Sequence, residues 1–117
     1  MGSIIDPGSA QSLIQEYQQQ NSAPGGPAII TPDSSFLNGY FLDRGSLEAI
    51  LSNPNAVGVS VYLAKHPDFV GAGTHQFTLL YVAAEPNTAP GALTPYVSTG
   101  DVYGDPPPCP PHCGSIG

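Results

Sequence analysis

Two cysteines and a histidine lie close together near the C-terminal end, which reads Cys-Pro-Pro-His-Cys-Gly-Ser-Ile-Gly. Two thiolates and an imidazole are ligands that Zn²⁺ and Cu⁺ prefer, so Cys109, His112 and Cys113 form a candidate metal site. A structural zinc site takes four ligands, usually as two spaced pairs. His66 and His75 are the remaining donors of the favoured type, and either one could complete the site. The motif alone is an incomplete metal site.

The spacing of the two cysteines also limits their thiol chemistry. Cys-x-x-x-Cys is one residue longer than the Cys-x-x-Cys of oxidoreductases, and the order Cys-x-x-His-Cys does not match c-type haem attachment. A disulfide between Cys109 and Cys113 is geometrically feasible across a turn. Such a disulfide closes a very short loop, stabilises little and needs an oxidising compartment. It is a second candidate role for the pair.

The prolines around the cysteines favour a third, mechanical role. Proline-rich segments are stiff and extended, so they lose little entropy on docking into aromatic grooves. The chain has six tyrosines and four phenylalanines that could form such a groove. We expect the tail to dock on its own domain or on a neighbouring copy. The docking residues are predicted to be Pro106, Pro107, Pro108, Pro110 and Pro111.

The charge balance excludes several classes of partner. The 117 residues include nine acids but only two bases, Arg44 and Lys65, which gives a formal net charge of −7. Without a cationic patch the chain is poorly suited to bind nucleic acid or an anionic membrane surface. It has no apolar run of the roughly 18 residues that a membrane helix needs. We expect no cofactor, no nucleic-acid partner and no membrane insertion.

Neither a targeting signal nor a catalytic motif is evident. The N-terminal stretch lacks the basic and apolar regions of a signal peptide, so the cytoplasm is the default location. Export by a route without such a signal is the alternative. G-x-S-x-G is absent, and the Gly-Ala-Gly at 71–73 precedes no predicted helix. No nucleophile, base and orienting group can be assigned together, so we expect no enzyme activity.

Hydrophobic periodicity predicts two helices. The first spans 9–20, begins at a cap formed by Ser9 or Asp6, and presents one apolar stripe. That stripe comprises Ala10, Leu13, Ile14 and Tyr17. The second spans 46–52, with Ser46 as its N-cap. Its inward-facing residues are predicted to be Leu47, Ile50 and Leu51.

Period-2 patterns predict the strands of a small antiparallel sheet. In the strand at about 57–65, apolar residues alternate with small or polar ones, which predicts one buried face. Those apolar residues are Val57, Val59, Val61 and Leu63. A strand at 75–84 is apolar on both faces and so should be central, and a third is expected at 95–104. The predicted fold is α+β, with both helices on one face of the sheet.

The predicted organisation is one small globular domain at 1–104, which begins with an N-terminal arm at 1–8. A Pro- and Cys-rich tail at 105–117 follows it.

The chain also resembles a family of small bacterial proteins of the Bacteroidota type. In that family a short helix ending in Leu-x-x-Pro precedes a Gly-hydrophobic-x-hydrophobic-Tyr strand, and the chain closes in Cys-Pro-Pro-x-Cys-Gly. The matching residues here are Leu51, Pro54, Gly58, Val59, Val61, Tyr62, Cys109, Pro110, Pro111, Cys113 and Gly114. Members often carry a cysteine before the strand's glycine, where this chain has Asn-Ala-Val-Gly. The resemblance implies no known activity.

Together these observations predict a non-enzymatic structural or interaction protein that associates with copies of itself. Its N-terminal arm and Pro-rich tail would dock on neighbouring copies, in an open, filament-like array that need not close. Strand addition at a sheet edge is a second contact mode. The alternatives are a metal- or thiol-dependent binding module built on the C-terminal motif, and a small enzyme whose cleft no motif reveals.

Overall fold

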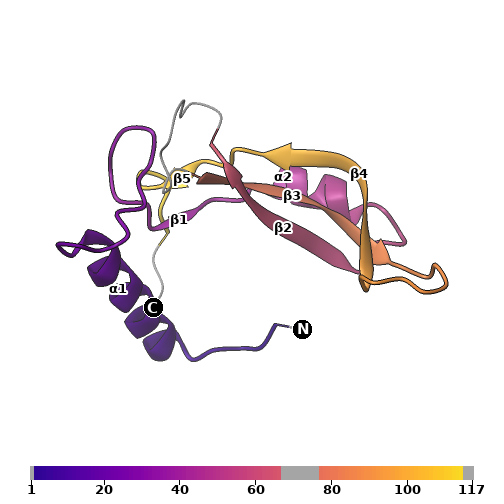
Figure 1. Cartoon of the computed structure of the whole chain (residues 1–117), viewed down its shortest axis with the longest axis horizontal. Helices are drawn as coiled ribbons and strands as arrows, with labels where there is room; N and C mark the ends of the chain where they lie inside the picture. Colours follow the sequence, from indigo (N-terminus) through magenta and orange to yellow (C-terminus); the bar gives the residue numbers. More distant parts are fainter. Residues whose placement is uncertain (1, 67–76, 115–117) are drawn as a thin grey trace. The chain divides into compact units, whose positions relative to one another are not determined.

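The computed structural model describes residues 2–66 and 77–114 (Figure 1). Its helices are α1 (Pro7–Ser22) and α2 (Arg44–Leu51). Its strands are β1 (Gly39–Tyr40), β2 (Gly58–Lys65), β3 (Phe77–Pro86), β4 (Tyr96–Gly104) and β5 (Pro108–Cys109). The described chain forms two compact units, which we call the helix unit (2–41 and 107–114) and the sheet unit (42–66 and 77–106). Two helices with antiparallel strands confirm the predicted α+β fold.

The sheet unit is built on three antiparallel strands in the order β2-β3-β4. β2 pairs with β3 in one unbroken register, from Gly58 opposite Ala84 to Lys65 opposite Phe77. The pairing of β3 with β4 shifts register between Tyr81 and Ala83. The prediction that 75–84 forms the central strand is therefore confirmed for β3. The link from β2 to β3 lies outside the described residues.

Helix α2 packs on one face of this sheet, where Ile50 meets Tyr81 and Ala83 in a small core. The helix begins at Arg44, two residues before the predicted start. Asp43 is its N-cap and accepts a hydrogen bond from the Ser46 backbone N–H at 2.9 Å. The predicted cap at Ser46 is wrong, because a carboxylate three residues upstream already satisfies that N–H. Leu51, predicted to face inward, is exposed.

On the opposite face of the sheet, one tyrosine links the two outer strands. Tyr62 Oη on β2 lies within hydrogen-bonding distance, 3.3 Å, of Ser98 Oγ on β4. Since β3 lies between these strands, the phenol must cross β3. Val82 and Ala84 of β3 are buried, whereas Tyr62 is itself 52% exposed.

The prediction of one buried face on β2 is wrong for most of its residues. Val59 packs against the core, but Val57 and Val61 are at least half exposed and Leu63 is 71% exposed. The reason is that β2 is an edge strand. The eight-residue helix α2 packs on this face through Ile50, near Val59. Val61 and Leu63 lie further along β2, opposite Tyr81 and Leu79 of β3.

The helix unit is held by polar contacts as well as by packing. Asp6 caps α1, as one of the two predicted candidates, and Pro7 occupies the first turn. Near the other end Asn21, only 1% exposed, donates to the Ile29 carbonyl at 2.9 Å and accepts from the Ile29 N–H at 2.6 Å. Tyr17 Oη donates to the Leu37 carbonyl at 2.7 Å. The apolar stripe itself remains partly exposed, with Leu13 more than half accessible. In the described part of the chain, neither helix is long and apolar enough to cross a bilayer.

Candidate functional site

The C-terminal motif folds into a turn that follows a short pair of strands. Pro108–Cys109 forms β5, which pairs antiparallel with β1 at Gly39–Tyr40. Backbone hydrogen bonds flank this pair, from Asn38 N to the Cys109 carbonyl at 2.7 Å and from Phe41 N to the Pro107 carbonyl at 2.9 Å. Residues 107–114 of the tail therefore dock within their own helix unit, where main-chain hydrogen bonds join them to residues 38 and 41.

The two cysteines meet across the turn. Their Cα atoms are 4.7 Å apart and their sulfurs are joined as a disulfide. Residues 110–111 were expected to continue as an extended rod, and that expectation is wrong. His112 N donates to the Pro108 carbonyl at 3.0 Å and Cys113 N donates to the Pro111 carbonyl at 2.9 Å. Pro110 and Pro111 therefore sit inside a turn that brings the two sulfurs together.

The candidate metal ligands do not form a donor set in this state. Sulfurs joined to one another are not thiolates, so Cys109, His112 and Cys113 cannot act together as ligands. Within residues 2–66 and 77–114, no three side chains of the ligand types are grouped to hold a metal ion. A metal site on the reduced thiols stays a prediction.

Of the two histidines considered as a fourth metal ligand, the structure describes one, His66. His66 is 5% exposed, and its Nε2 lies 3.0 Å from Asp105 Oδ1. This pairing explains how a buried imidazole is tolerated at the end of β2. His75 lies outside the described residues.

A groove of about 370 Å³ runs along α1 beside the disulfide. The helix lines it with Ile14 and three glutamines, and the tail lines it with both cysteines and Gly114. Its side chains are uncharged and offer no nucleophile or general base. The groove suits docking better than catalysis.

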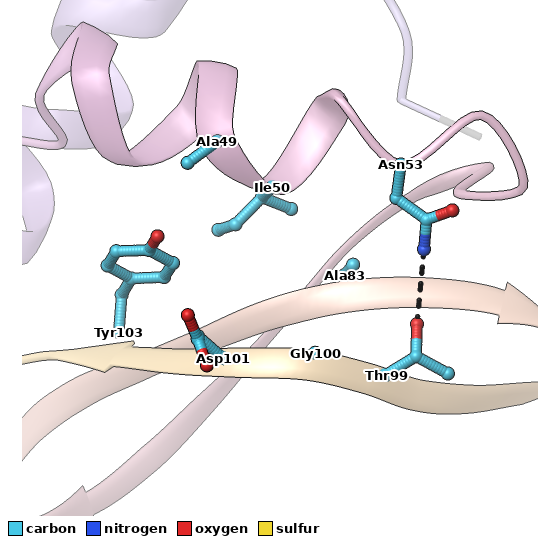
Figure 2. A pocket seen from close by; sticks show the side chains of 8 residues that line it. All are labelled: Ala49, Ile50, Asn53, Ala83, Thr99, Gly100, Asp101 and Tyr103. Atoms are coloured by element: carbon cyan, nitrogen blue, oxygen red, sulfur yellow. Dashed lines mark hydrogen bonds between the residues drawn. The ribbon is translucent and has the colours of Figure 1, made fainter.

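A smaller pocket, of about 90 Å³, lies between α2 and the sheet (Figure 2). Figure 2 shows Ile50 and Asn53 pointing down from the α2 segment toward Thr99, Asp101 and Tyr103 on β4. Its volume would hold about three water molecules at roughly 30 Å³ each. No nucleophile is paired with a base among the residues that line it.

Polar contacts at the rim of this pocket fasten the α2 segment to the sheet. Glu85 Oε2 accepts hydrogen bonds from Asn53 Nδ2 at 2.8 Å and from Thr99 Oγ1 at 2.7 Å. The hydrogen bonds from Asn53 and Thr99 stabilise the carboxylate and lower the pKa of Glu85 below its ordinary value. We interpret this arrangement, the Glu85 clasp (Asn53, Glu85 and Thr99), as structural.

The feature that the sequence prediction missed is the free edge of β2. Val61, Tyr62 and Leu63 are 50%, 52% and 71% exposed, and they lie in a strand whose outer edge pairs with no described strand. β2 carries no acidic residue, and its single charge is Lys65 at the end. A regular edge without an interrupting charge, proline or bulge could have been recognised from the sequence as unprotected.

The N-terminal arm, described from residue 2 to residue 6, is the second exposed apolar feature. It leads away from the start of α1 as an irregular extended segment (Figure 1). Ile4 is fully exposed and Ile5 is more than half exposed. Both side chains are available for contact with another surface.

The chain matches no protein-family model, and no curated protein or solved structure is significantly similar to it.

Proposed function

We propose that this protein is a non-enzymatic structural or interaction protein that associates with copies of itself. The observation that carries the proposal is the unprotected β2 edge, with Val61, Tyr62 and Leu63 all at least half exposed. An edge strand offers a row of unpaired backbone donors and acceptors, which another strand can complete. Strand addition there would also cover the three apolar side chains.

The other edge of the same sheet differs in ways that discourage pairing. β4 is interrupted by the register shift, by Gly100 in a left-handed conformation (φ +83°) and by the charged Asp101. Irregularities and charges of this kind keep natural sheet edges from adding strands. β2 has neither an irregularity nor an internal charge, so the two edges are a natural contrast.

The C-terminal tail is engaged, at its strand, within its own chain. Its strand β5 is already paired with β1 of the same chain. The tail therefore contributes to self-association by completing the helix unit, and β2 supplies the contact between copies.

Two matched variants test the proposal by sedimentation velocity over a range of concentrations. Leu63→Lys changes a side chain of β2 that is 71% exposed, and Val102→Lys changes a side chain of β4 that is 62% exposed. Neither should unfold the protein, which far-UV circular dichroism would check. We expect the wild type and V102K to form assemblies and L63K to sediment as the 12.0 kDa monomer. A wild-type chain that stays monomeric at all concentrations would overturn the proposal.

A metal- or thiol-dependent binding module is the second candidate function. It is favoured by the closeness of Cys109 and Cys113, whose Cα atoms are 4.7 Å apart with His112 in the same turn. Reduction would release two thiols beside an imidazole. Calorimetric titration of the reduced chain with Zn²⁺, using His112→Ala as the control, tests it. Equal binding by both proteins would contradict a site of this composition.

A further inference from the structure

We infer that the strand added at the β2 edge is the N-terminal arm of a second copy. This inference rests on the proposed self-association and names the contact that produces it. The arm, Gly2–Asp6, is extended up to the cap of α1, where Asp6 has φ −56° and ψ 134°. Five extended residues reach about 16 Å, which covers five of the eight residues of β2.

The side chains of the arm match those of the edge on both faces. In an extended strand neighbouring residues point to opposite sides, so Ile4 and Ile5 would lie on different faces of the enlarged sheet. β2 presents Val61 and Leu63 on the face that carries α2 and Tyr62 on the other. An arm laid beside residues 61–63 therefore places one isoleucine against Val61 and Leu63 and the other against Tyr62.

Charge favours the same pairing. Each copy has a formal charge of −7, so most contacts between copies bring acidic surfaces together. Among the five described strands, β2 is the one with a net positive charge, which Lys65 supplies. The described arm carries a single charge, the acidic Asp6, so its approach to β2 is attractive.

This contact is heterologous, because the arm and the β2 edge are different surfaces of the chain. Each copy would give an arm to one neighbour and receive an arm from another. Such contacts build open chains unless the rotation between copies happens to close a ring. The contact therefore assembles many copies, whereas pairing of β2 with the β2 of a second copy would stop at a dimer.

A mixing experiment with two defective variants separates these arrangements. Ile4→Ser/Ile5→Ser removes the apolar side chains of the arm, and L63K blocks the edge. We expect each variant alone to be monomeric. An equimolar mixture should form a complex of twice the monomer mass, because L63K still has an arm and I4S/I5S still has an edge. Leu93→Ser, at another fully exposed position, is the control and should assemble like the wild type.

Other outcomes distinguish the failure of this inference from failure of the proposed function. If I4S/I5S alone forms dimers, and adding L63K to that variant abolishes them, the β2 edges pair with one another. The inference that the arm is the partner is then wrong. If I4S/I5S and L63K each assemble like the wild type, both the arm and the edge are overturned. If the wild type is monomeric, self-association itself is overturned. If I4S/I5S is monomeric but L63K assembles like the wild type, the arm binds a surface other than β2, and the inference is wrong.

Discussion

At the scale of single residues, one buried amide determines the end of α1. Asn21 is 1% exposed and exchanges two hydrogen bonds with the backbone of Ile29. Asn21→Ala would leave the partly buried Ile29 N–H without its partner, whereas the Ile29 carbonyl keeps the hydrogen bond from the Leu37 N–H. The expected loss is about 1 to 3 kcal/mol in the free energy of unfolding. Urea denaturation followed by circular dichroism measures this loss. Ser22→Ala, at an exposed neighbour, should change stability by less than about 0.5 kcal/mol. Equal effects would show that Asn21 is not the anchor.

The Glu85 clasp makes a prediction about acid. Hydrogen bonds from Asn53 and Thr99 hold the pKa of Glu85 below its ordinary value of 4.5 in the folded state. Its contribution to stability is therefore complete above pH 4.5 and is lost as the pH falls through the lowered pKa. Glu85→Gln removes this titration, so the variant should lose less stability than the wild type as the pH is lowered below that value. Thermal melts across the acidic range check it, with Glu16→Gln on the exposed face of α1 as control. Parallel acid profiles for the wild type and E85Q would contradict the clasp.

At the scale of elements, sequence patterns located strands better than they located buried faces. The alternation at 57–65 and the apolar run at 75–84 predicted β2 and β3 closely, because period-2 patterning is a local property. Which face becomes buried depends on what packs against it, and α2 is too short to cover Val61 and Leu63. The exposure of these two side chains therefore could not be derived from the alternation alone.

The C-terminal motif shows the same limit. Its residue types and spacing identified Cys109 and Cys113 as a candidate pair. The path of the chain between them was predicted wrongly, because proline was expected to extend the segment rather than to occupy a turn. The pairing of β5 with β1 joins residues about 70 positions apart, and a two-residue strand carries no periodic signal from which to predict it.

The disulfide and β5 together make an element-scale prediction. Cys109→Ser/Cys113→Ser opens a loop with a sequence separation of 4, so the chain-entropy account gives a loss of about 2 kcal/mol. We expect faster amide exchange at Asn38 and Phe41, whose N–H groups donate to the tail. Exchange in β3 should not change, because β3 belongs to the sheet unit. Faster exchange in both units would mean that the disulfide stabilises the whole chain.

At the scale of the whole molecule, net charge should oppose assembly. Each copy carries −7, whereas the proposed contact is mainly apolar, with Lys65 as the one charged residue of β2. Raising NaCl from about 10 mM to about 150 mM shortens the screening length from about 30 Å to about 8 Å, which weakens repulsion between copies. The apolar contact itself is little affected by salt at these concentrations. We therefore expect larger assemblies at the higher salt concentration in sedimentation velocity. KCl at equal ionic strength should give the same shift. Assemblies that dissociate as salt is added would instead show that ion pairs, and not the apolar edge of β2, hold the copies together.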